Sequence, residues 1–231
     1  MRSDAPIQAL LFDTFGTTVD WRGSLIGHLQ QIGAEHGYSA DWAKMADTWR
    51  AKYKPAIQSV NEGKRPWTNF DRLHRETLDE LLPEFGLKKV KDAERDEMVR
   101  GWERLWGWAD TVPGLSRLKQ KFIIGSLSNG NVRQLTNMAK HASLPWDVVF
   151  GGDLFHRYKP APEVYDGAVA LLACPASAVV MVAAHNNDLQ AARSRGMKTA
   201  FVRRATEDPA PKEKWDFVAG DFQELAVQLG A

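Results

Sequence analysis

Short apolar runs alternate along this chain with longer segments whose apolar residues recur every three or four positions. Apolar runs bounded by turn residues are typical of buried strands, whereas the longer spacing is typical of helices that pack one face on a core. Strands are predicted at 10–12, 122–127, 179–182 and 199–202, and helices at 132–141, 163–172 and 188–195. Strand alternating with helix predicts an α/β fold with a doubly wound parallel sheet.

Residues 20–108 break this rhythm, because they contain no convincing strand and several capped helical segments. We therefore predict a helical cap domain, residues 20–108, inserted after the first strand of a core domain formed by residues 1–19 and 109–231. The last cap helix is expected to reach Trp106, because apolar residues keep helical spacing to that point. Helices are expected at 25–32, 40–60, 68–82 and from 92 onward, opened by Ser24, Ser39, a capping box of Thr68 and Asp71, and Asp92.

The charge and cysteine content narrow the function to small-molecule chemistry. Lys and Arg number 30 and Asp and Glu 29, so the chain lacks the basic excess of nucleic-acid-binding proteins. Its apolar runs are far shorter than the roughly 20 residues of a membrane span, and residues 1–6 do not resemble a signal peptide. We expect a cytoplasmic protein without nucleic-acid or membrane partners. The single cysteine, Cys174, excludes an internal disulfide and a multi-cysteine zinc site.

Polar residues follow each predicted strand. Asp13 comes directly after the first strand and precedes a glycine turn, which makes it a candidate nucleophile. Ser128 and Asn129 follow the second strand, Lys159 lies in a later loop, and the segment from His185 to Asp188 follows the third strand. Because the carboxyl ends of parallel strands meet at one edge of a sheet, these side chains are expected to converge around Asp13.

These motifs resemble the four ordered motifs of the haloacid dehalogenase superfamily, and the resemblance covers nearly the whole chain. Most members of that superfamily are magnesium-dependent phosphatases, which need a second aspartate two positions after the nucleophile and an early carboxylate in the last motif. This chain has Phe15 and Ala184 there, and neither side chain transfers a proton or binds a hard cation. The chain is instead similar to the type II 2-haloacid dehalogenases, which have an aromatic residue at position 15 and use no metal or cofactor.

The resemblance implies a reaction on short 2-haloalkanoic acids, with the L form of 2-chloropropionate preferred, and a homodimer. Asp13 would displace the halide to form an aspartyl ester that water then hydrolyses, while Lys159 keeps Asp13 ionised. Arg50, from a Trp-Arg pair in the cap, would stabilise the departing halide ion. The substrate-binding candidates are Thr14, Phe15, Thr17, Trp49, Ser128, Asn129, Tyr165 and Asn187, with Trp67 and Phe70 as cap residues that could overhang the site.

His185 departs from the better-known dehalogenases, which have an asparagine at this position. Histidine is the commonest general base near neutral pH, so His185 could activate the water that hydrolyses the ester. In that hypothesis a carboxylate such as Asp20 orients His185, and Asp188 holds Lys159. In the alternative, His185 only bonds loop backbone and Asp188 is the base.

Three functions stay open from the sequence. The first is a metal-independent hydrolase of the carbon–halogen bond in haloacetates and 2-halopropionates, with fluoroacetate as a further candidate substrate. The second is a magnesium-dependent phosphatase of the same superfamily, and the third is a catalytically silent binding protein. No metal site is predicted, because the histidines lack metal-ligand spacing.

Overall fold

A six-stranded parallel sheet forms the centre of the computed structural model, which describes residues 5–231. The strand order is β5-β4-β1-β6-β7-β8, so β1 lies where the chain turns from one half of the sheet to the other. All four predicted strands are present, and two more, β5 and β8, extend the edges. The strands are β1 (Ala9–Phe12), β4 (Ile123–Leu127), β5 (Val148–Phe150), β6 (Val179–Ala183), β7 (Lys198–Val202) and β8 (Phe217–Ala219).

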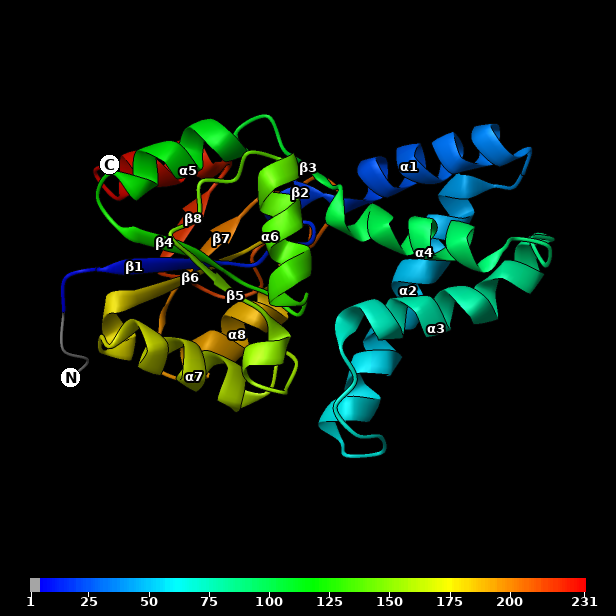
Figure 1. The fold of residues 1–231 in the computed structure, drawn as a ribbon. Helices are drawn as coiled ribbons and strands as arrows, with labels where there is room; N and C mark the ends of the chain where they lie inside the picture. Colours follow the sequence, from blue (N-terminus) through cyan, green and yellow to red (C-terminus); the bar gives the residue numbers. More distant parts are fainter. Residues whose placement is uncertain (1–4) are drawn as a thin grey trace.

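Helices cover both faces of this sheet, as Figure 1 shows. Alternate residues of β1 enter different apolar clusters: Leu10 and Phe12 join one, and Ala9 and Leu11 join the other. A strand buried on both faces explains why the strands read as continuous apolar runs. The first face carries α5 (Thr111–Lys119), α6 (Val132–His141) and α9 (Phe222–Gln228), and the second carries α7 (Pro162–Leu172) and α8 (Asn186–Ser194). The predicted doubly wound α/β fold is confirmed.

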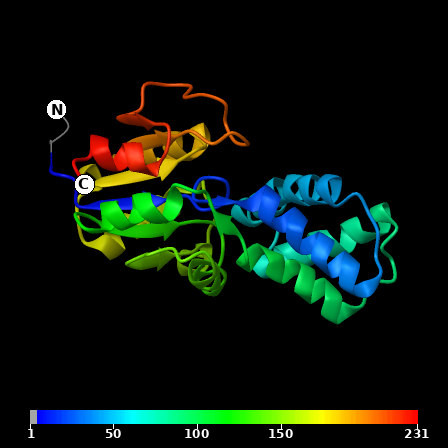
Figure 2. The same cartoon turned by 90° about the horizontal axis from the view of Figure 1, so that it is seen from above.

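Four helices form a separate cap beside the carboxyl edge of the sheet (Figures 1 and 2). They are α1 (Trp21–His36), α2 (Trp42–Asn61), α3 (Phe70–Leu81) and α4 (Asp92–Arg100). Where the chain enters and leaves the cap, β2 (Val19–Asp20) and β3 (Trp106–Gly107) form a short antiparallel pair. The helical cap after the first strand is confirmed, whereas the domain boundaries at 20 and 108 stay a prediction.

The cap differs in detail from the expectation. The last helix ends at Arg100, because a 3-10 turn follows at Gly101–Glu103 and Trp106 pairs in β3, so the absence of strands before 108 was wrong. The predicted capping residues Ser24, Ser39 and Thr68 were also wrong. The capping side chains of α1, α2 and α3 are Asp20, Asp41 and Asn69, whose oxygens accept backbone N–H bonds from Gly23, Lys44 and Arg72.

Tryptophan and other aromatic side chains fill the cap core. Trp102 is fully buried, with ring centroids 5.5 Å from Trp49, 6.2 Å from Trp21 and 4.3 Å from His74. The same apolar cluster continues through Phe15 into the sheet, so the cap packs directly on the turn that follows Asp13. No helix within residues 5–231 combines the length and apolar composition that a membrane crossing requires.

Candidate active site

Asp13 occupies the first position after β1, and its backbone N–H donates to the carbonyl of Val182 in β6 (2.9 Å). The following turn is tight because Gly16 adopts a φ of 89°, which few other residues tolerate. Thr18 then donates its hydroxyl to the Asp13 carbonyl (2.7 Å), and Thr17 donates to Oδ2 of the Asp13 carboxylate (2.8 Å). The turn thus fixes the carboxylate at the strand-order switch of the sheet, where open α/β folds bind ligands.

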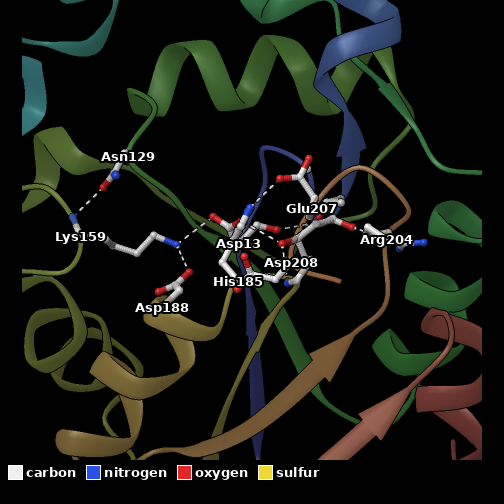
Figure 3. A network of polar contacts seen from close by, with 12 residues as sticks. Asp13, Asn129, Lys159, His185, Asp188, Arg204, Glu207 and Asp208 are labelled. Carbon is white, nitrogen blue, oxygen red and sulfur yellow. Dashed lines mark hydrogen bonds and ion pairs between the residues drawn. The ribbon is translucent and has the colours of Figure 1, made fainter. Parts of the chain in front are cut away.

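Lys159 contacts both buried aspartates of the site, as Figure 3 shows. Its Nζ donates to Oδ1 of Asp13 (2.9 Å) and to Oδ2 of Asp188. The other oxygen of Asp188 accepts from the Tyr165 hydroxyl (2.6 Å). Both Asp188 oxygens are therefore engaged in holding and orienting the lysine. The Lys159 backbone N–H donates to Oδ1 of Asn129 (2.7 Å), which ties the lysine loop to the end of β4.

His185 bridges the nucleophile and a second carboxylate. Its Nδ1 lies 3.0 Å from Oδ2 of Asp13, and its Nε2 lies 2.8 Å from Oε2 of Glu207. Glu207 belongs to the loop after β7, drawn in orange in Figure 2, where it extends from the sheet toward the cap. Its other oxygen accepts from the indole N–H of Trp21 (2.9 Å).

These contacts decide the charge of each group. Burial opposes ionisation of Asp13, but the charges of Lys159 and His185 outweigh it and hold the pKa of Asp13 well below its ordinary value. Burial alone lowers the pKa of His185, yet its hydrogen bonds to Asp13 and Glu207 raise it to about 10. At neutral pH the resting site therefore has an ionised Asp13 and a protonated His185. A protonated imidazole cannot accept a proton, so His185 is not a base in this state.

A cavity of about 400 Å³ opens between Asp13 and the cap helix α2. Its cap wall is formed by Arg50, Tyr53 and Ile57, which recur at helical spacing on α2. The Arg50 guanidinium lies 4.6 Å from the ring centroid of Tyr53, 5.4 Å from Trp21 and 6.0 Å from Phe15. It has no carboxylate partner among residues 5–231. An unpaired cation bounded by aromatic rings lines the same cavity as Asp13 and suits a small anion.

Two buried hydroxyls beside Asp13 lack partners. Within residues 5–231, Oγ of Ser128 and Oγ1 of Thr14 make no hydrogen bond. Ser128 lines the cavity together with Asn129, whose amide donates to the Tyr53 hydroxyl of α2. A buried unpaired hydroxyl is costly unless a ligand satisfies it. This side of the cavity is therefore suited to bind a carboxylate.

The donor set around Asp13 does not fit a divalent cation. Oδ1 accepts from the Lys159 ammonium, and Oδ2 faces Thr17 and His185. The described part of the chain has no group of three or more His, Cys, Asp or Glu side chains arranged to hold a metal ion. Ala184, in the loop where a phosphatase has a carboxylate, offers only a backbone N–H, which donates to Thr17. Two cationic side chains, Lys159 and His185, and the Thr17 hydroxyl occupy the contacts of the Asp13 carboxylate, where a divalent cation would need further oxygen ligands.

A family model of haloacid dehalogenase-like hydrolases matches residues 7–196. The chain belongs to this family. Its structure is similar to that of the defluorinating L-2-haloacid dehalogenase Rha0230, with a TM-score of 0.94 and 42% identity over 97% of this chain and 96% of that one. The L-2-haloacid dehalogenase PA0810 is also 42% identical, with a TM-score of 0.93 over 97% of this chain and 99% of that one.

A curated relative, (S)-2-haloacid dehalogenase 1 of Pseudomonas sp. (strain CBS-3), is 28% identical over 202 residues, 86% of each protein. The predicted resemblance to the 2-haloacid dehalogenases is thus confirmed, and the chain is an enzyme of this hydrolase family.

In this haloacid dehalogenase-like hydrolase, most of the predicted residues come together. The predicted residues that line the cavity are Asp13, Phe15, Arg50, Ser128, Asn129, Lys159, His185, Asn187 and Asp188. Thr14 is buried and is not among the lining residues.

Six predicted substrate-binding residues, Thr14 among them, lie outside the cavity wall, and the contacts of the other five indicate other roles. Thr17 orients Asp13, and Tyr165 orients Asp188. Trp49 is buried in the cap core, where its indole N–H bonds to the carbonyl of His74 and the hydroxyl of Thr77. Phe70 packs behind Phe15, with 5.6 Å between the ring centroids. Trp67 packs on His156 and Tyr158 along an outer groove.

The predicted orienting carboxylate of His185 was wrong. Asp20 caps α1 through the backbone N–H of Gly23, whereas Glu207 holds His185. Glu207 has no sequence signal, because it lies in a polar loop without a motif and almost 200 residues after the nucleophile. Tyr53 was also missed, although it follows Arg50 at helical spacing and that spacing places both on one helix face.

Proposed function

We propose that this enzyme hydrolyses the carbon–halogen bond of L-2-haloacids through a covalent ester on Asp13, without a metal ion. The observation that carries this proposal is the pairing across one cavity of an ionised, buried Asp13 with the unpaired cation of Arg50. A carboxylate nucleophile and an anion-binding guanidinium on opposite sides of a small cavity fit an in-line displacement of halide. The names of the two relatives that are 42% identical support the substrate class.

In the first half-reaction a carboxylate oxygen of Asp13 attacks C2 of the substrate. The C–O bond forms while the carbon–halogen bond breaks, and the electron pair leaves with the halide toward Arg50. The unpaired hydroxyl of Ser128, which lines the cavity, binds the substrate carboxylate. Holding both ends of the substrate sets C2 in front of Asp13, which supplies much of the rate advantage of such reactions.

In the second half-reaction water adds to the ester carbonyl of Asp13. Esterification removes the negative charge that faces Nδ1 of His185, so one of the two groups that raise the pKa of His185 is lost. The imidazole then releases its Nδ1 proton to the solvent, as the counterpart of the departed halide, while Nε2–H stays bonded to Glu207. Nδ1 thereby becomes the base that takes a proton from water. The tetrahedral adduct collapses to the protonated carboxyl of Asp13, and the 2-hydroxy acid leaves with the proton held by His185. Asp13 then gives its proton to Nδ1 of His185, which restores the ionised carboxylate and the protonated imidazole.

Asp188 is better suited to position Lys159 than to activate water. Both of its oxygens are occupied, by Lys159 and by Tyr165, and neither contacts His185 or Glu207. Of the two bases that the sequence left open, the geometry supports His185.

The proposal is tested by halide release from chloroacetate, fluoroacetate and each enantiomer of 2-chloropropionate, with a chelator present. We expect release from the L enantiomer, no effect of the chelator, and loss of activity in Asp13→Asn. Fluoroacetate belongs in the set because one relative is named as defluorinating. Hydrolysis of a generic phosphate ester that depends on magnesium, without halide release, would overturn the proposal in favour of a phosphatase. The homodimer and the cytoplasmic location implied by the resemblance stay predictions.

A further inference from the structure

Trp21 connects the cap to the water-activating side of the site. It is the first residue of α1, its side chain is buried, and its Nε1–H donates to Oε1 of Glu207 (2.9 Å). The opposite oxygen of that carboxylate holds Nε2 of His185 (2.8 Å), whose Nδ1 faces Asp13. A continuous chain of hydrogen bonds therefore runs from the cap, through Glu207 and His185, to the nucleophile.

The loop that carries Glu207 has two further anchors, and neither orients its carboxylate. Arg204 donates to the Thr17 carbonyl (2.8 Å) and to both oxygens of Asp110, which fixes the start of the loop. Asp208 accepts from the backbone and side chain of Asn186 (Figure 3).

Only one other donor reaches Oε1 of Glu207 within residues 5–231. It is the exposed hydroxyl of Thr206, at 3.2 Å. The indole of Trp21 is thus the buried group that sets the orientation of the carboxylate.

The same indole also supports the halide side of the cavity. The Arg50 guanidinium lies 5.4 Å from the Trp21 ring, and Trp21 stacks on the buried Trp102 of the cap core. A shift of α1 would therefore move the Trp21 indole relative to both the Arg50 guanidinium and the Glu207 carboxylate.

We propose that Trp21 is a positioning residue for ester hydrolysis. It keeps the Glu207 carboxylate oriented toward His185 only when the cap packs on the core. This inference rests on the proposed function. It assigns Trp21 to the second half-reaction, because halide displacement by Asp13 requires no proton transfer from His185.

The test is Trp21→Phe, which keeps an aromatic ring against Arg50 and Trp102 and removes the N–H donor. We expect halide displacement in a single turnover to keep its rate, while ester hydrolysis slows roughly 10-fold to 100-fold, as for outer partners that orient metal-bound histidines. The ester then accumulates as added mass on the protein after rapid quenching. The pKa of His185, followed by NMR of labelled imidazole, is expected to fall, because Glu207 is held less firmly.

A matched control is Trp108→Phe. The Trp108 indole donates to the Gly16 carbonyl (3.0 Å) at the same junction but does not contact Glu207. This variant should keep the wild-type ratio of the two half-reactions. In Glu207→Gln, adding Trp21→Phe should slow hydrolysis little further, since the two residues act through one contact.

The inference is overturned if Trp21→Phe hydrolyses the ester at the wild-type rate with an unchanged pKa of His185. If Trp21→Phe fails to fold, 3-benzothienylalanine at position 21 keeps the bicyclic ring and lacks the N–H, and the same two measurements decide. Absence of halide release by the wild-type enzyme would instead contradict the proposed function, so the two failures are distinguishable.

Discussion

Replacing Glu207 with Gln is expected to separate the two half-reactions most sharply. The amide keeps the size of the side chain and can still accept a hydrogen bond, but it removes the negative charge 2.8 Å from Nε2 of His185. Asp13 is untouched by this change, because its contacts are with Lys159, Thr17 and Nδ1 of His185. The nucleophile should therefore still form the ester.

The size of the effect follows from the pKa of His185. Its rise from 6.5 to about 10 corresponds to about 5 kcal/mol in favour of the protonated imidazole, supplied by Asp13 and Glu207 against the cost of burial. In the ester only Glu207 remains to orient the ring and to stabilise the imidazolium that forms as water is deprotonated. Losing a general base and its support costs roughly 10²-fold to 10⁴-fold in rate. We therefore expect kcat of Glu207→Gln to be lower than that of the wild-type enzyme by a factor within this range.

The assay combines stopped-flow halide release with intact-protein mass spectrometry on L-2-chloropropionate. Glu207→Gln should release about one halide per site in a burst and then stall, with the ester mass present on the enzyme. Asp208→Asn is the control, because it makes the same charge change one residue away, where the side chain bonds Asn186 and not His185. Turnover of Glu207→Gln at the wild-type rate, or an equal stall in Asp208→Asn, would refute the role of the Glu207–His185 pair.

Four further changes test other parts of the structure. His185→Asn should lower the melting temperature most at or below pH 6.5 and progressively less toward pH 10, because a raised pKa stabilises the folded state until that proton is lost. Trp102→Ala should lower the free energy of unfolding in urea by about 3–5 kcal/mol, since a fully buried ring leaves a cavity. Gly16→Ala should impair turnover, because φ is 89° and the added Cβ would lie 2.4 Å from the Glu207 carboxylate; steady-state kinetics measure this. Ile57→Trp should lower kcat/KM for 2-bromohexanoate more than for chloroacetate, since Ile57 lies between the cavity and an adjoining apolar groove of about 410 Å³.

The periodicity of apolar residues was enough to predict the sheet and the layers around it, because strands buried on both faces leave continuous apolar runs. It missed β5 and β8, which have three residues each, too few to show a pattern. The periodicity also predicted a last cap helix that extends beyond Arg100. The reason is that residues that pack into the cap core keep helical spacing through the 3-10 turn that follows. The spacing of apolar residues indicates which side chains are buried, but it does not indicate which backbone hydrogen bonds form.

The same distinction applies to the site. Asp13, Lys159 and Asp188 were predictable because strand ends converge at one edge, whatever the loops do. Glu207 was not, because its position depends on contacts that join distant parts of the chain: Arg204 to Asp110, and the indole of Trp21. A loop residue placed by such contacts has no pattern of its own in the sequence.

In the reaction that we propose, the charges of the resting site set the order of the two half-reactions. Three carboxylates, Asp13, Asp188 and Glu207, lie among the cations Lys159, His185 and Arg50. Of these three cations only Arg50 lacks a carboxylate partner within residues 5–231, and a fourth cation, Lys54, also lines the cavity. Halide displacement moves the negative charge of Asp13 onto the halide beside Arg50, and His185 loses a partner in the same step. The imidazole therefore becomes a base only after an ester exists to be hydrolysed. A histidine between two carboxylates stays protonated, and so cannot act as a base, until one of the carboxylates loses its charge. A neutral asparagine at that position has no such titration and could not set this order.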